Sequence, residues 1–331
     1  MSFQSIGVIG SGSWGTALGL LLHENGQPVT IWGHDPEHLA RMRATRKNPE
    51  YLPGIELPPG LKLADRLEDL RECDLLLIVT PSKAIREVAV RLRAAQPKAG
   101  AVLLSCTKGV ERGTGLRMSE ILAEEFPSHP IAVLSGPSHA EEVARRMPTC
   151  VVLGCADAEI SRRLQRAFSA SWFRAYTNDD VAGIELGGAL KNIFALAAGV
   201  CDGLHLGDNA KAALITRALV ELGRLAVALG SRRETIMGLS GLGDLMVTCF
   251  SRHSRNRAVG ERLGQGESLA TIEGSMHMVA EGIPTTFSGY ECAQRCGVEV
   301  PIIEQVKAIL EGKVAPAEAL TRLFGRDPKP E

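Results

Sequence analysis

The sequence predicts two domains: a doubly wound α/β domain over residues 1–180, followed by an all-α domain over residues 181–331. In the first half, short apolar runs alternate with amphipathic stretches, a pattern typical of βαβ units and a parallel sheet. The strand signals stop after Thr177-Asn178-Asp179-Asp180, and only helical patterns follow. A chain of 331 residues is long enough to form two domains.

The strands are predicted from their apolar runs, and Leu75–Val79 is apolar at every position, as in a strand covered on both faces. Segment 47–60 carries Pro49, Pro53, Pro58 and Pro59, which lack a backbone donor, so we expect a loop there. The predicted strands are Ile6–Ile9, Val29–Trp32, Leu75–Val79, Val102–Ser105, Ile131–Leu134 and Val151–Leu153. The predicted helices are Thr16–Leu22, Ile85–Leu92 and Ile160–Phe168, then Val181–Val200, Ala210–Leu229, Ser254–Leu263 and Pro301–Leu310.

Composition excludes several classes of protein. There are 37 Lys and Arg against 38 Asp and Glu, a net charge of −1, and only 4% aromatic residues, which argues against a nucleic-acid partner. The best membrane-span candidate, Ala212–Leu229, is broken by three charged residues, so we expect no membrane insertion. The first residues run straight into a strand pattern, so we expect no export signal, and the eight cysteines form no C-x-x-C pair. These observations favour a cytoplasmic, reduced protein without a metal site. A homodimer is the expected assembly.

A glycine-rich turn, Gly10-Ser11-Gly12-Ser13-Trp14-Gly15, follows the first strand and precedes a helical run. Glycines at this spacing allow a tight turn and let the backbone approach a pyrophosphate at the helix N-terminus, where N–H groups favour an anion. In this strand-turn-helix context the motif predicts a Rossmann-like domain that binds NAD or NADP. The alternative is a purely structural glycine turn.

The end of the second strand is where an NAD enzyme places an acid on the ribose. Here Gly33 and His34 come first, and Asp35 precedes Pro36, which favours a helix cap over a ribose ligand. Because His34 and Arg41 lie nearby in the sequence, NADP is as plausible as NAD.

Polar residues follow two later strands. Lys108 comes after Val102–Ser105, and Gly136-Pro137-Ser138-His139 comes after Ile131–Leu134. Ligands of open α/β sheets bind at the carboxyl ends of strands, so we expect both tips near the nicotinamide. Lys108 is either an anion ligand or a solvated loop lysine, and His139 is more typical of a helix start than of a site.

The stretch 185–199 is small or apolar on almost every side, which predicts a buried helix carrying Lys191 and Asn192. Buried polar groups need partners, and burial lowers the pKa of a lysine towards the range useful for acid/base catalysis. The alternative is a lysine that reaches the surface. Asp244, which ends a second glycine-rich stretch, can orient such a lysine.

Ser254 is predicted to cap a helix whose first turn carries Arg255 and Asn256, a combination that favours a phosphate-sized anion. A basic, solvated helix end is the alternative. Val279–Thr286, with Glu281, is by itself predicted to be a structural polar loop between helices.

Together these motifs resemble one family from about Ile6 to Lys313, the bacterial-type NAD(P)-dependent glycerol-3-phosphate dehydrogenases. The matching stretches are 10–17, 32–34, 108–109, 134–138, 190–192, 241–245 and 254–256. The resemblance implies reduction of dihydroxyacetone phosphate to sn-glycerol 3-phosphate for glycerophospholipid synthesis, in a site between the two domains. The rival interpretations are a dehydrogenase of a 3-hydroxyacid or phosphogluconate, and a dinucleotide-binding module without turnover.

The resemblance also implies roles for single residues, with Lys191 as the catalytic acid/base. The residues implied for the cofactor, beside Gly10, Gly12 and Gly15, are Ser13, Trp14, His34, Lys108, Ala140, Arg255, Val279 and Glu281. Those implied for the substrate are Lys108, Gly136, Ser138, Lys191, Asp244, Ser254, Arg255 and Asn256.

Overall fold

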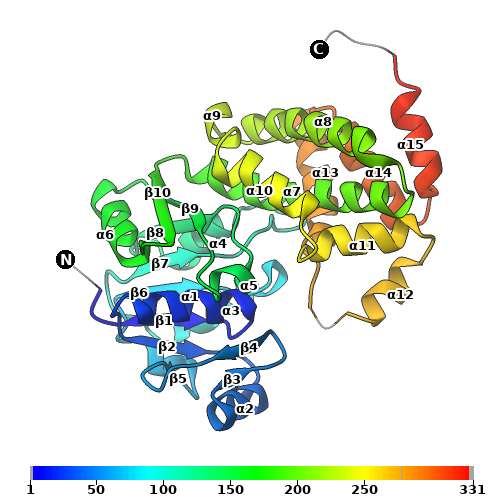
Figure 1. Cartoon of the computed structure of the whole chain (residues 1–331). Helices are drawn as coiled ribbons and strands as arrows, with labels where there is room; N and C mark the ends of the chain where they lie inside the picture. The colour runs from blue at the N-terminus through cyan, green and yellow to red at the C-terminus, as the bar shows by residue number, and fades with distance from the viewer. Residues whose placement is uncertain (1–2, 277, 328–331) are drawn as a thin grey trace. The chain divides into compact units, whose positions relative to one another are not determined.

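The computed structural model describes residues 3–276 and 278–327 (Figure 1). The chain forms two compact units. The first contains the described residues up to Lys108 together with Arg117–Glu185, and the second contains Gly109–Leu116 with the described residues from Leu186 onwards. The chain passes between the units at Lys108, at Leu116 and, for the last time, inside helix α7 (Val181–Gly203).

The first unit is built on an eight-stranded sheet of order β10-β9-β8-β7-β6-β1-β2-β5 (Figure 1). The predicted parallel sheet is confirmed except for one neighbouring pair, β8 and β9, which is antiparallel. The short strand β5 and the strand β10 were not predicted from the sequence. The strands are β1 (Ile6–Ile9), β2 (Val29–Trp32), β5 (Lys62–Leu63), β6 (Leu75–Ile78), β7 (Val102–Ser105), β8 (Ile131–Ser135), β9 (Thr149–Gly154) and β10 (Phe173–Asn178).

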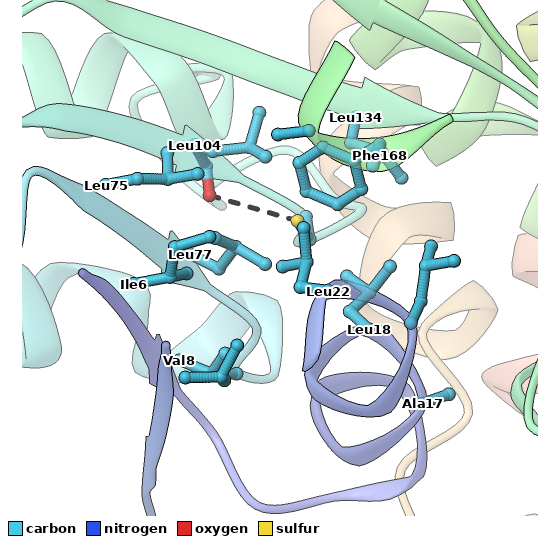
Figure 2. Packing of buried hydrophobic residues seen from close by; sticks show 14 of the residues in the cluster. Ile6, Val8, Ala17, Leu18, Leu22, Leu75, Leu77, Leu104, Leu134 and Phe168 are labelled. Carbon is cyan, nitrogen blue, oxygen red and sulfur yellow. Dashed lines mark hydrogen bonds between the residues drawn. The ribbon is translucent and has the colours of Figure 1, made fainter. Parts of the chain in front are cut away.

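Both faces of this sheet are covered. Ile6 and Val8 of β1 pack with Leu18 of α1 and Phe168 of α6 in one apolar cluster (Figure 2). Alternate residues of a strand point to opposite faces, so the neighbouring Gly7 lies towards the other face, against Leu76, Leu70 and Cys73. The helices of this unit are α1 (Ser13–Glu24), α2 (Pro36–Thr45), α3 (Ile85–Ala94), α4 (Met118–Glu125), α5 (Ala140–Val143) and α6 (Ala158–Phe168), with 3₁₀ turns η1 (Leu67–Leu70) and η2 (Ser82–Ala84).

The proline-rich segment that was predicted to be a loop is instead a β-hairpin. Strand β3 (Lys47–Asn48) pairs antiparallel with β4 (Leu52–Glu56), with Asn48 opposite Leu52 and Lys47 opposite Glu56. A two-stranded sheet consists only of edge strands, where a proline without an N–H group is tolerated. This explains why Pro53 can lie within β4.

The second unit is helical in the part of the chain that the structure describes, as the sequence predicts. The four helices predicted there are confirmed, but Val279–Thr286 is not wholly a loop, because α13 begins at Gly282. The helices are α7, α8 (Gly207–Ala228), α9 (Arg233–Ile236), α10 (Asp244–Phe250), α11 (Arg255–Gly264), α12 (Leu269–Gly274), α13 (Gly282–Cys296), α14 (Pro301–Leu310) and α15 (Pro316–Phe324), with a π-helical turn η3 (Leu239–Gly243) before α10.

Among the described residues, the helix with the length and composition of a membrane span is α7, and not Ala212–Leu229, which was the best candidate in the sequence analysis. By length and composition α7 is able to cross a membrane, yet 94% of its most apolar 18-residue stretch is buried inside the protein. Helix α7 therefore has the burial of a core helix.

Two buried glutamates cap helices that are remote in sequence. Glu185 accepts hydrogen bonds from Ser119 N (2.8 Å) and from the Arg117 guanidinium (2.7 Å) at the start of α4. Glu221 of α8 accepts from Ile302 N (3.0 Å) and Ile303 N (2.9 Å) at the start of α14. Both carboxylates satisfy N–H groups that a helix N-terminus leaves without an intrahelical partner.

Candidate active site

The glycine motif forms the turn from β1 into α1. Gly10 has φ +130°, and a Cβ atom there would lie 2.2 Å from Val79 O. A Cβ atom on Gly15 would lie 1.9 Å from Gly10 O, so both positions require glycine. A Cβ atom on Gly12, in contrast, would meet nothing within 4 Å. The turn therefore leaves open space beside Gly12, at the helix N-terminus where a dinucleotide pyrophosphate binds.

The position of β1 in the sheet supports the same site. Strand β1 lies between β2 and β6: the chain runs from β1 outwards to β2 and β5, and then crosses back to β6 and continues in the opposite direction along the sheet. Ligands of doubly wound folds bind at such a switch point, beyond the carboxyl ends of the strands. Ser13 and the half-buried Trp14 begin α1 at this edge.

Asp35 caps α2, as predicted. Its carboxylate accepts hydrogen bonds from Glu37 N (2.9 Å) and His38 N (3.1 Å). The hydrogen bond from the His38 backbone lowers the pKa of Asp35 below its ordinary value. The neighbouring His34 is exposed after the end of β2.

Lys108 and Ser138 meet at one carbonyl group. The Lys108 ammonium donates to Gly136 O at 3.2 Å, and the Ser138 hydroxyl donates to the same oxygen at 3.2 Å. Gly136 has φ +133°, which turns the chain sharply after β8. Ala140 is buried at the first position of α5, with His139 as the preceding cap residue. Three of the residues implied for the substrate are thus neighbours.

Lys191 is buried, with 5% of its surface exposed, so the alternative of a surface lysine is wrong. Its ammonium donates to Asp244 Oδ1 at 2.5 Å and to Thr248 Oγ1 at 2.6 Å. Asp244 is 1% exposed and Thr248 is 3% exposed. A lysine held by two buried oxygen atoms has a fixed direction, which is what a proton donor requires.

A close backbone contact creates this cluster. Gly187 precedes Lys191 by one helical turn, on the same face of α7. A Cβ atom on Gly187 would lie 2.7 Å from Ser240 O, in the π-helical turn that leads into Asp244. The missing side chain lets this turn approach α7 and brings Asp244 to Lys191. Such π-helical turns are frequent at functional sites.

A second polar cluster links α7, α11 and α13. The Asn256 amide donates to Asn192 Oδ1 at 2.8 Å, and Asn256 Oδ1 accepts from Gly282 N at 2.9 Å. Ser254 caps α11 as predicted, accepting from Arg257 N at 3.2 Å. The buried Asn256 therefore uses its side chain for contacts within the protein.

Arg255 is exposed beside this cluster and donates from Nη1 to Val279 O at 3.0 Å. The structure thus brings together Arg255 and the loop that precedes α13, which ends at the half-buried Glu281.

Sequence reasoning missed two polar residues at these sites. Thr248 follows Asp244 by one helical turn, a spacing that offered a signal once α10 was recognised as a helix. Asn48 contacts the glycine turn from the β3–β4 hairpin, which was not predicted. Within residues 3–276 and 278–327 there is no group of three or more His, Cys, Asp or Glu side chains that can hold a metal ion.

Comparison with known proteins assigns both halves of the chain to the same family. Residues 5–161 match the family model for the NAD-dependent glycerol-3-phosphate dehydrogenase N-terminus, and residues 180–321 match the corresponding C-terminus. The chain is 48% identical to glycerol-3-phosphate dehydrogenase (NAD(P)+) of Geobacter metallireducens, over 99% of both proteins. It is 47% identical to the enzyme of the same name from Caulobacter vibrioides, over 100% of both.

The fold has the same relatives. A crystal structure of glycerol-3-phosphate dehydrogenase from Coxiella burnetii superposes with a TM-score of 0.94 at 40% identity, covering 98% of this chain and 99% of that one. Since both family models match and the relatives align over their full length, the chain belongs to the NAD-dependent glycerol-3-phosphate dehydrogenase family.

Proposed function

We propose that this protein reduces dihydroxyacetone phosphate to sn-glycerol 3-phosphate with NADH or NADPH, in a reversible reaction. Membership of the family supports the substrate and the cofactor. The observation that carries the chemistry is the buried Lys191 ammonium, 2.5 Å from Asp244 and 2.6 Å from Thr248.

The open space beside Gly12, with no protein atom within 4 Å of a Cβ atom built there, supports dinucleotide binding at this turn. When bound, the reduced nicotinamide supplies a hydride to the carbonyl carbon of the substrate. The residues of the chain bind and orient it: the N–H groups of the turn and of the first turn of α1 meet the pyrophosphate. The proposed cofactor contacts are Gly10, Gly12, Ser13, Trp14, Gly15, His34, Lys108, Ala140, Arg255, Val279 and Glu281.

The phosphate of the substrate is assigned to the start of α11. Arg255 supplies a guanidinium there, and the free N–H groups of a helix N-terminus favour an anion. Asn256 lies in the first turn of α11, and its side chain fixes this turn by binding Asn192 and Gly282. The proposed substrate contacts are Lys108, Gly136, Ser138, Lys191, Asp244, Ser254, Arg255 and Asn256.

Lys191 is assigned as the proton donor. As the carbonyl carbon takes up the hydride, negative charge develops on the carbonyl oxygen, and the Lys191 ammonium gives that oxygen a proton to form the hydroxyl group of the product. In the reverse direction the neutral amine takes the proton back. Asp244 and Thr248 hold the lysine in place, and Lys108 stabilises the developing charge.

We further propose that the protein works as a cytoplasmic homodimer without membrane insertion, and that its product supplies glycerophospholipid synthesis. The buried position of α7 supports a protein that does not insert. Light scattering on the purified protein at several concentrations tests the dimer, and a mass of one chain throughout would contradict it.

The first test of the function is oxidation of NADH and NADPH, followed by their near-ultraviolet absorbance, after addition of dihydroxyacetone phosphate to purified protein. Unphosphorylated dihydroxyacetone is the control. Rapid oxidation that requires the phosphate is the expected result. A folded protein that oxidises neither cofactor would contradict the proposal.

A further inference from the structure

The β3–β4 hairpin contacts the glycine turn through one buried side chain. Asn48 is 1% exposed, and its amide nitrogen donates to Ser11 O at 2.8 Å and to Thr16 Oγ1 at 2.8 Å. Its oxygen accepts from Tyr51 N at 3.4 Å, inside the hairpin. A carboxamide nitrogen carries two hydrogens, so these two bonds use both of them.

The two acceptors belong to the turn and to the helix that follows it. Ser11 is the residue between Gly10 and Gly12, and Thr16 lies in the first turns of α1. The Thr16 hydroxyl itself donates to Ser11 O at 3.3 Å. The Ser11 carbonyl is therefore held from two directions, by Asn48 and by Thr16.

The direction of the Ser11 carbonyl determines where the next N–H group points. A trans peptide is planar, so the C=O of Ser11 and the N–H of Gly12 point to opposite sides. With Ser11 O directed inwards at the buried Asn48, the Gly12 N–H is directed away from Asn48. The space beside Gly12 holds no protein atom within 4 Å of a Cβ built there.

The hairpin that carries Asn48 is itself held in place. Arg46 precedes β3 in the left-handed conformation, at φ 51°, and its guanidinium donates to Leu57 O (3.2 Å), Pro58 O and Leu61 O (3.0 Å). Leu52 and Leu57 are buried in the core of the first unit. The position of Asn48 is thus fixed from both ends of the hairpin.

We propose that Asn48 is a positioning residue for dinucleotide binding: it holds the Ser11–Gly12 peptide so that the Gly12 N–H faces the pyrophosphate. This inference rests on the proposed function for the identity of the ligand. Without Asn48 the peptide is free to rotate, and part of the binding free energy is used to restore its orientation. Affinity for the cofactor then falls, while the groups that act on the substrate stay in place.

Asn48→Ala tests this, with Asn25→Ala as a matched control. Asn25 follows the other end of α1 and also donates to two backbone carbonyl groups, Ala167 O (2.8 Å) and Ser169 O (3.3 Å). We expect Asn48→Ala to raise the Kd for NADH and NADPH about tenfold, equivalent to ~1.4 kcal/mol. The KM for the cofactor should rise as well, while kcat and the KM for dihydroxyacetone phosphate stay unchanged. Asn25→Ala should lower the Tm comparably and leave the Kd unchanged.

A lowered Tm with an unchanged Kd in Asn48→Ala would overturn the inference, as would an equal rise of the Kd in Asn25→Ala. Should Asn48→Ala fail to fold, Thr16→Val carries the test, because it removes one acceptor of Asn48 and one donor to Ser11 O while keeping the side-chain volume. We expect the Kd of Thr16→Val for the cofactor to rise about threefold, which corresponds to a fraction of the free energy of one hydrogen bond. An unchanged Kd would overturn the inference.

The Kd is measured without substrate, by calorimetry or by fluorescence of the bound cofactor. Wild-type protein that binds NADH but does not oxidise it with dihydroxyacetone phosphate contradicts the proposed function. The inference about Asn48 is still tested in that case, by the ratio of the Kd of Asn48→Ala to the Kd of the wild type.

Discussion

Replacement of Lys191 tests the proposed chemistry most directly. Lys191→Met removes the ammonium and keeps a chain of similar length in the buried position. Loss of a general acid reduces kcat by about 10²–10⁴, which corresponds to roughly 3–5 kcal/mol of transition-state stabilisation. The same change removes a partner from the buried Asp244, and breaking a buried ion pair costs about 3–5 kcal/mol of stability.

The two losses must be separated, and a second buried lysine in the same unit offers a control. Lys211 is also buried, at 8% exposed, and binds Asp202 at 2.9 and 2.8 Å. Lys211→Met should lower the free energy of unfolding with kcat unchanged, by less than Lys191→Met because Arg257 still pairs with Asp202. Lys191→Arg keeps a cation beside Asp244, but a guanidinium does not release its proton, so kcat should fall while the protein stays more stable than Lys191→Met.

The assay is kcat at saturating dihydroxyacetone phosphate and NADH, with the folded fraction of each variant measured by circular dichroism. A folded Lys191→Met or Lys191→Arg variant whose kcat stays within about tenfold of wild type, ~1.4 kcal/mol, would refute the assignment of Lys191 as the acid. A matching loss of kcat in Lys211→Met would refute it as well.

Three further results are expected. Arg255→Ala should raise the KM for dihydroxyacetone phosphate about 10–100-fold, since a hydrogen bond to a charged group contributes ~1.5–3 kcal/mol, and an unchanged KM would exclude the phosphate contact. Gly12→Ala should fold with an unchanged Tm, because its methyl group meets no protein atom within 4 Å. It should bind NADH at least tenfold more weakly, about 1.4 kcal/mol, because the methyl group fills the space of the ligand. Unchanged NADH binding would place the pyrophosphate elsewhere. Burial raises the pKa of Glu221 to about 7, so the stability it contributes is full below its unfolded pKa and is lost as the pH rises through 7. Between pH 5.5 and 8, the free energy of unfolding of the wild type in urea should therefore fall by about 2 kcal/mol relative to that of Glu221→Gln. Parallel pH profiles of the two proteins would contradict this.

The features that the sequence predicted correctly are local ones. Gly10, Gly12 and Gly15 define a turn by their spacing alone, and the apolar surroundings of Lys191 within its own helix indicate burial. Asp35 before Pro36 is a cap because both residues act on the next turn of the chain. Each of these depends on neighbours within a few residues.

The features that were missed depend on contacts between distant segments. The contact of Asp244 with Lys191, 53 residues away, was expected from the two residue types and is confirmed, but the close approach at Gly187 that makes it has no sequence pattern of its own. Strand β3 has two residues and gains its hydrogen bonds only by pairing with β4. The contacts of the Asn256 side chain with Asn192 and Gly282 were not predicted, because nothing in its own helix indicates them.

The cap that Glu185 provides for α4 bears on how the amino-terminal unit is completed during synthesis. Helix α4 leaves the ribosome well before its cap, which follows Ser119 by 66 residues. A chain that ends at residue 180 contains every strand of the sheet but lacks the carboxylate that binds Arg117 and Ser119. Such a truncated chain should fold less cooperatively and be cleaved by proteases near residue 117, whereas a chain extended through the first turns of α7 should resist them. The first unit is thus finished only when the chain has entered the helix that carries Lys191.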